Sequence, residues 1–165
     1  MCDRCAYGGT VFTSYSTNVL YAEQVFRLAN SVVKYVNVPC LCMATTNFSI
    51  SAPMTVEPIE FDASKFPIGS RYCNKMAGWR LHSFLQPALL VHLLTQGFNV
   101  FSIDADWQMV RPLATLPRYD VVALQDHEPH GHYLNVGLMY VRNTDTAMIT
   151  WHVLQIDPTW RGIKA

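Results

Sequence analysis

The sequence lacks the features that define several large classes of protein. Its 12 Lys and Arg residues equal its 12 Asp and Glu residues in number, so no basic field favours a nucleic-acid partner. No apolar run approaches the roughly 20 residues of a membrane-spanning helix. The first five residues, MCDRC, also lack the apolar region of a signal peptide. As read, the chain is therefore expected to be cytoplasmic, with no membrane segment.

Internal repeats and low-complexity linkers are missing too, so nothing in the sequence marks a boundary between domains. Half of the 165 residues are hydrophobic, which is enough for one buried core. We therefore expect residues 1–165 to form a single domain.

Cysteine is present in an odd number, five, and four of the five fall in two short motifs. Cys2 and Cys5 form a C-x-x-C motif, and Cys40 and Cys42 form a C-x-C motif within an apparent strand. This spacing matches none of the common zinc-finger or zinc-ribbon patterns. We predict free thiols, either buried or at the surface, and a zinc site made by these four residues is the alternative.

Apolar segments of strand type recur along the first part of the chain. Residues 10–15 and 40–45 are predicted strands, and residues 55–61 are a third candidate. Pro58 cannot donate a hydrogen bond to a neighbouring strand, so this third segment is expected at an edge or as an irregular segment.

Helical segments alternate with these strands. After Asn18, a candidate N-cap, apolar residues recur every three and four positions as far as Val36. A second helical zone spans about residues 75–96, where Pro87 either begins a new helix or kinks a single one, and Gly97 ends it. Strands separated by helices predict an α/β fold, with a mostly parallel twisted sheet and helices on both faces.

The most informative stretch is residues 100–107, VFSIDADW, in which a short apolar strand ends in two aspartates. Side chains alternate along a strand, so Asp104 and Asp106 leave its end on the same side. Two carboxylates at the end of a sheet strand suit Mn²⁺ or Mg²⁺ better than zinc, and the ion would hold a diphosphate. The alternative is a solvated turn. Trp107 is expected to fill the adjacent core.

Two later segments extend this pattern into an ordered series. FSIDADWQMVRPL is followed by DVVALQD and then by YLNVGLMYVRNT. Together they resemble the nucleotide-diphospho-sugar transferase domain, a family of glycosyltransferases of the A-type fold, most clearly over residues 87–151. The resemblance implies transfer of a sugar from a nucleotide-diphosphate donor to a glycan or protein acceptor, with Mn²⁺ or Mg²⁺ as cofactor.

The resemblance also implies roles for individual residues. Asp106 would bind the metal directly, while Asp104 would meet the ribose or bind the ion through water. The candidate catalytic residues are Asp126, which would hydrogen-bond the sugar, and Asn135, which would orient donor or acceptor hydroxyls. Gly137 would leave room for the donor to approach the backbone. The alternatives are a turn-initiating carboxylate at Asp126 and a strand bulge at Gly137.

The end of the first strand would receive the nucleobase in this fold. Thr13 and Tyr15 are the candidate contacts there, and Tyr15 would stack on the base; an ordinary core position is the alternative. The family often has a basic residue just before the proline at position 87, where this chain has Gln86.

Beyond residue 151 the sequence does not continue with the acceptor segment and downstream histidine of the family. The domain is therefore expected to be partial, and transfer by the chain as given to be poor. A non-catalytic nucleotide-sugar-binding relative or a fragment is the main alternative, and a fragment of a eukaryotic member would belong in the Golgi. A haloacid-dehalogenase-type phosphohydrolase, which also uses D-x-D after a strand, is the third reading.

Overall fold

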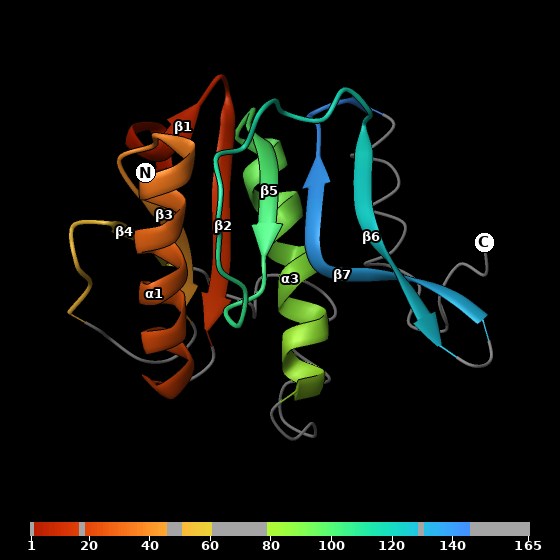
Figure 1. The fold of residues 1–165 in the computed structure, drawn as a ribbon, viewed down its shortest axis with the longest axis horizontal. Coiled ribbons are helices and arrows are strands. Elements are labelled where there is room, and N and C mark those ends of the chain that lie inside the picture. The colour runs from red at the N-terminus through yellow and green to blue at the C-terminus, as the bar shows by residue number, and fades with distance from the viewer. Residues whose placement is uncertain (1, 17–18, 46–50, 61–78, 129–130, 146–165) are drawn as a thin grey trace.

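A computed structural model of the chain describes residues 2–16, 19–45, 51–60, 79–128 and 131–145 (Figure 1). Within these residues, seven strands form one sheet in the order β4-β3-β2-β5-β7-β6, and β1 pairs with β2. The strands are β1 (Ala6–Tyr7), β2 (Thr10–Ser16), β3 (Leu41–Thr45), β4 (Val56–Glu60), β5 (Asn99–Ile103), β6 (Val121–Glu128) and β7 (Gly131–Val141). The helices are the short 3-10 helix η1 (Cys2–Cys5) and the α-helices α1 (Val19–Val36) and α3 (Trp79–Thr95).

The sheet is mixed rather than mostly parallel, which corrects the prediction in part. Strands β4, β3, β2 and β5 run parallel to one another, whereas β7 runs antiparallel to both β5 and β6. The reason is the connection between β6 and β7, which is only two residues long in the sequence. So short a connection joins antiparallel strands, because a parallel pair needs a long crossover.

The two α-helices cover opposite faces of the sheet, as predicted (Figure 1). On the α1 face, Val25 and Leu28 belong to a buried cluster with Phe12 of β2. On the α3 face, Leu89 and Leu93 belong to a second buried cluster that includes other strand residues. Helix α1 therefore buries one apolar surface against its face of the sheet, whereas α3 is buried on more than one side, since residues 88–91 are all buried.

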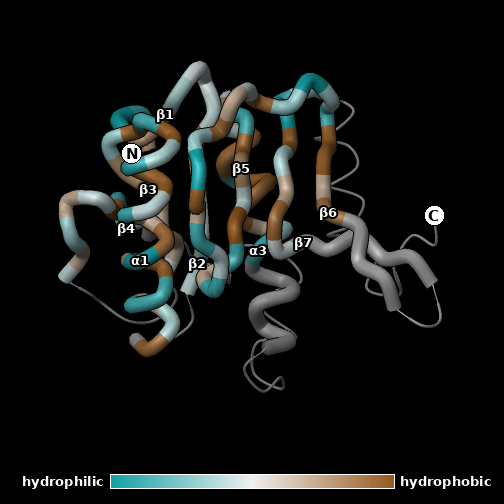
Figure 2. Tube along the Cα trace, in the orientation of Figure 1, coloured by the Kyte–Doolittle hydropathy of each residue, from teal (hydrophilic) through white to brown (hydrophobic). Residues whose placement is uncertain are grey.

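Helix α1 confirms the prediction of a helix from apolar residues that recur every three and four positions. It ends at Val36 as predicted, and Asn37 follows in the left-handed conformation with a φ of 61°. Asparagine tolerates this conformation better than most residues, so it is a suitable end to the helix. In Figure 2, hydrophobic and hydrophilic residues alternate along α1, as expected of a helix with one buried face.

Helix α3 is a single helix that continues through Pro87. Gly97 ends it as predicted, with a φ of 93°. The amide of Gly97 donates to the carbonyl of Leu94 at 3.0 Å, and that of Phe98 to the carbonyl of Leu93 at 3.3 Å. These are the two bonds of a Schellman motif, which use carbonyl groups that the helix itself leaves unpaired.

Strand β4 forms one edge of the sheet, so the prediction for the segment that contains Pro58 is confirmed. At the other end of the sheet, the pairing of β6 with β7 has an irregularity. Ala123 faces Met139, but the next residue, Leu124, faces Asn135, so residues 136–138 have no counterpart on β6. Gly137 lies in this irregular part of β7.

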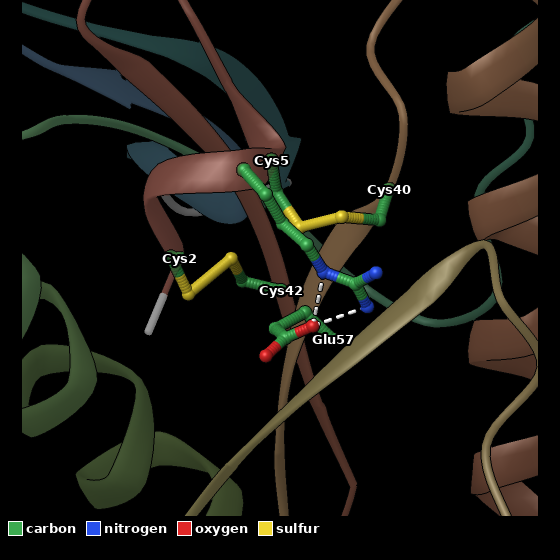
Figure 3. Close-up of polar contacts among 6 residues, drawn as sticks. Cys2, Cys5, Cys40, Cys42 and Glu57 are labelled. Carbon is green, nitrogen blue, oxygen red and sulfur yellow. Dashed lines mark hydrogen bonds and ion pairs between the residues drawn. A yellow bond between two sulfur atoms is a disulfide. The ribbon is translucent and has the colours of Figure 1, made fainter.

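The prediction of free thiols is wrong for four of the five cysteines. Cys2 is bonded to Cys42 and Cys5 to Cys40, and all four side chains are buried (Figure 3). Helix η1 lies against the start of β3, which brings the paired Cα atoms to 6.1 and 4.8 Å, within the usual disulfide range. Such proximity depends on tertiary packing, which the spacing of the cysteines does not reveal. Cys73 lies outside the described residues.

In the part of the chain that the structure describes, no helix has the length and apolar character needed to span a membrane.

Candidate functional site

The two aspartates of the D-x-D motif lie near the middle of the sheet, directly after β5. Strand β5 is parallel to its neighbour β2, and β3 lies on the other side of β2. Strands β3 and β4 therefore lie on one side of β2 in the sheet, and the later strands β5, β7 and β6 lie on its other side (Figure 1). In open α/β sheets, a crevice for ligands forms at the carboxyl ends of strands where the strand order changes direction.

The first contact at this position joins the ends of β2 and β5. Thr13 pairs in register with Ser102, so Tyr15 and Asp104 are the next residues along the same face of the two strands. The hydroxyl of Tyr15 donates a hydrogen bond to the carboxylate of Asp104. The Tyr15 side chain is only 9% exposed. One of the two aspartates is therefore held by a buried tyrosine.

The electrostatics of Asp104 follow from this position. Burial raises the pKa of Asp104, the nearby charge of Asp106 raises it further, and the hydrogen bond from Tyr15 opposes both effects. Burial likewise raises the pKa of Tyr15 far above its ordinary value, with Asp104 and then Asp106 adding to the increase. Two carboxylates that repel each other in a partly buried place are stabilised by a bound cation.

The backbone of Asp104 is fixed by β7 and by a turn. Its amide donates to the carbonyl of Gly137 at 2.7 Å, and its own carbonyl accepts from the amide of Trp107 at 3.1 Å. Gly137 is buried beside Asp104, so the structure brings together these two residues that the sequence assigned to one site. The contact uses the irregular part of β7, where a bulge was the alternative explanation for the glycine.

The loop that follows the motif is fastened to α1. The amide of Met109 donates to the hydroxyl of Ser31 at 3.0 Å, and that hydroxyl donates to the carbonyl of Leu28 at 2.7 Å. Ala105 and Met109 pack against the apolar cluster on the α1 face. The turn that carries Asp104 and Asp106 is thus anchored both before and after the aspartates, as a preorganised binding site requires.

Asp106 and Trp107 lie on the solvent side of this turn. Asp106 is exposed, unlike Asp104, which is partly buried. Trp107 is 37% exposed, so the expectation that its ring fills the adjacent core is wrong. Ala105, between the two aspartates, packs against the apolar cluster on the α1 face.

Two buried polar contacts lie deeper along the same pair of strands. Thr13 is fully buried and donates from its hydroxyl to the carbonyl of Cys42 at 3.0 Å. Gln86 of α3 is also buried, and its amide donates to the hydroxyl of Ser102 at 3.1 Å. Gln86 therefore fixes α3 against β5 two residues before Asp104. A contact of Thr13 with a nucleobase stays a prediction.

The two candidate catalytic residues lie in the hairpin of β6 and β7. Asp126 pairs with Tyr133, and Asn135 pairs with Leu124, beyond the irregularity of β7. Their side chains lie outside what the structure describes, so their roles stay predictions.

Sequence reasoning missed the hydrogen bonds that hold the D-x-D turn. The one visible signal was the alternation of polar residues at Thr13 and Tyr15 and at Ser102 and Asp104, which places all four side chains on one face of adjacent strands. No comparable signal indicated Ser31, which lies 78 positions before Met109 in the chain.

In comparison with known proteins, no family model matches the sequence and no curated protein is significantly similar to it.

Proposed function

We propose that the chain binds a nucleotide-diphosphate sugar through Mn²⁺ or Mg²⁺ at Asp104 and Asp106, and that it acts as a glycosyltransferase of the A-type fold. The observation that carries the proposal is the arrangement of these two carboxylates at the carboxyl end of β5, where the strand order changes direction. The resemblance of three sequence segments to the nucleotide-diphospho-sugar transferase domain adds the substrate class.

The donor set suits a hard divalent cation. Both groups are carboxylates in the turn that directly follows β5, and such oxygen ligands favour Mg²⁺ or Mn²⁺. The raised pKa of Asp104, caused by burial and by the charge of Asp106, indicates a site whose negative charge is poorly compensated without a cation. When bound, the metal ion would neutralise the charge that develops on a departing nucleoside diphosphate.

The two aspartates have unequal freedom, which suggests a division of roles. Asp104 already accepts one hydrogen bond from Tyr15 at its side chain and donates one to Gly137 from its backbone. Asp106 is exposed at the surface of the turn. Asp106 is therefore the better direct ligand of an ion that arrives together with the nucleotide-diphosphate sugar. Asp104 would hold the ribose or bind the ion through water.

The sugar would lie toward the hairpin of β6 and β7, where Asp126 and Asn135 are the proposed contacts. If the Asn135 side chain contacts only the sugar, Asn135→Ala weakens binding of a sugar nucleotide more than binding of the bare nucleoside diphosphate. Calorimetry with the two ligands in Mn²⁺ measures both losses. An equal loss for the two ligands would mean that Asn135 supports the hairpin and does not contact the sugar.

Turnover tests the reaction class. The purified chain is incubated with Mn²⁺ and a panel of UDP- and GDP-sugars, and released nucleotide and glycosylated product are assayed separately. The proposal predicts metal-dependent release of the nucleotide from one donor, which Asp106→Asn abolishes. Donor binding without any release would identify a non-catalytic nucleotide-sugar binder. Hydrolysis of a generic phosphoester that is lost in Asp104→Asn would identify a phosphohydrolase instead.

A further inference from the structure

Helix η1 is joined to the start of β3 by two adjacent disulfides. Cys2 and Cys5 come from η1, and Cys40 and Cys42 come from the residues at the start of β3 (Figure 3). All four side chains belong to the buried cluster on the α3 face of the sheet. The sulfur atoms are thus part of the core, and they lie at the amino end of β3, whereas the D-x-D turn lies at the carboxyl end of the parallel strands.

An ion pair extends the same attachment to the edge strand. Arg4, between the two cysteines of η1, pairs with Glu57 of β4. Glu57 in turn lies opposite Cys42 in the register of β3 and β4. Helix η1 is therefore bonded to β3 and paired by charge with β4, although it belongs to the first few residues of the chain.

A metal site is the competing explanation for this cluster. The sulfur atoms of Cys5 and Cys40 and a carboxylate oxygen of Glu57 lie within 4.8 Å of one another. Zinc binds thiolates, however, and two sulfur atoms that are bonded to each other cannot supply them. In addition, the carboxylate of Glu57 is occupied by Arg4. Within the described residues, the arrangement therefore favours covalent closure over metal binding.

The two bridges are nested, and this determines how they contribute to stability. The inner bridge, Cys5–Cys40, spans 35 positions, and the outer bridge, Cys2–Cys42, spans 40. Either bridge alone restricts nearly the same long segment of the unfolded chain. Once one has formed, the other closes only a short additional loop, and the entropy it removes is correspondingly smaller. The two bridges therefore act largely as one constraint.

We propose that these disulfides form a redox-dependent clamp that the fold requires, and that the chain accordingly folds in an oxidising compartment. Closure of each bridge removes two protons and two electrons from a pair of thiols, and a disulfide-bearing oxidant accepts them and becomes a dithiol. Buried disulfides of this kind persist in secretory compartments and are rare in the cytosol. The clamp thus argues against the cytoplasmic location expected from the first five residues, and it is independent of the proposed sugar transfer.

The pairing is tested by peptide mapping of the full chain without reduction. Trypsin cleaves after Arg4 and separates Cys2 from Cys5, and chymotrypsin cleaves after Leu41 and separates Cys40 from Cys42. The chain is produced once with a secretion leader and once in a reducing cytosol. The proposal predicts both native linkages in the secreted protein. Linkage to Cys73 in place of either bridge, or four free thiols after secretion, would overturn it.

Thermal unfolding of four variants tests whether the fold requires the disulfides. The variants are Cys2→Ala with Cys42→Ala, Cys5→Ala with Cys40→Ala, the variant with all four of these cysteines replaced (the fourfold variant), and Cys73→Ala as control. Loss of one pair lowers the Tm by a few degrees, and loss of both lowers it by more than the sum of the two single losses. A fourfold variant that does not fold, while each paired variant folds, meets the same prediction. Equal Tm values for the fourfold variant and the control would contradict the clamp.

The metal alternative is excluded or established by the reduced chain. The protein is treated with a phosphine reductant and titrated with Co²⁺ alone, because thiolate ligands give a charge-transfer band that carboxylate ligands do not. The clamp predicts no such band and no recovery of the lost Tm. A band that disappears in Glu57→Gln or in Cys5→Ala, together with a recovered Tm, would replace the clamp by a metal site.

Discussion

At the scale of single residues, the site depends on a carboxylate whose surroundings disfavour its charge. Asp104 is partly buried and close to Asp106, and both effects raise its pKa. Because the folded state binds the proton more tightly than the unfolded state does, Asp104 stabilises the fold most at low pH. This stabilisation is lost as the pH rises through the raised pKa. At a pH above this raised pKa, the metal-free protein therefore holds a charge that lowers its stability.

Asp104→Asn should raise the Tm of the protein in EDTA at a pH above the pKa of Asp104, since the amide removes this charge and its oxygen still accepts from Tyr15. The same variant should lose the increase in Tm that Mn²⁺ with a nucleoside diphosphate gives the wild type. The advantage over the wild type in EDTA should shrink as the pH falls toward the pKa of Asp104. Asp106→Asn, at an exposed position, relieves only the repulsion between the two carboxylates and should raise the Tm in EDTA by less than Asp104→Asn does. A lower Tm for Asp104→Asn in EDTA would show that its charge is compensated.

Tyr15 offers a test between two roles for one side chain. The sequence assigns its ring to stacking on a nucleobase, whereas the structure gives its hydroxyl to Asp104. If the hydroxyl orients Asp104, Tyr15→Phe lowers the affinity for the Mn²⁺–nucleotide complex by roughly tenfold, the effect of losing a hydrogen bond to a charged group. If the ring stacks on the base, Phe preserves the affinity and Tyr15→Leu lowers it. Calorimetry with the two variants separates these outcomes.

At the scale of elements, the sequence predicted what depends on local periodicity. The strands that became β2, β3 and β5, the helix that ends at Val36 and the end of α3 at Gly97 all follow from nearby residues. The pairing of β7 with β5 and the attachment of η1 depend on contacts between distant segments. The same division applies to the site: the strand end with Asp104 and Asp106 could be read directly, but the contacts of Tyr15 and Ser31 could not.

Gly97→Ala should lower the free energy of unfolding by about 1–2 kcal/mol, because the added Cβ disfavours the left-handed conformation that ends α3. Apart from its two chain neighbours, no described residue has an atom within 4 Å of that Cβ, so the expected loss comes from the backbone conformation. Asn37→Gly, at the left-handed residue that ends α1, is the matched control and should not destabilise the protein. Denaturant unfolding measures both changes. An unchanged free energy for Gly97→Ala would mean that the end of α3 rearranges to accommodate the side chain.

At the scale of the whole molecule, two groups of residues lie at opposite ends of the sheet strands. The amino end of β3 carries the disulfides that join η1 to the core, and the carboxyl ends of β2 and β5 carry Tyr15, Asp104 and Asp106. Helices α1 and α3 pack on opposite faces, so the strand ends between them stay in a fixed relation. The proposed function depends on one claim: the carboxyl ends of β2 and β5 bind a nucleoside diphosphate through a divalent cation.

Calorimetric titration of the oxidised chain of residues 1–165 with UDP and with GDP, in Mn²⁺ and then in EDTA, tests that claim most directly. The account predicts binding of at least one nucleotide in Mn²⁺, none in EDTA, and none in Mn²⁺ for Asp106→Asn. Glu23→Gln, which removes one exposed negative charge from α1, is the control and should bind as the wild type does. Equal affinity in Mn²⁺ and in EDTA, or unchanged binding by Asp106→Asn, would contradict the metal site at the end of β5.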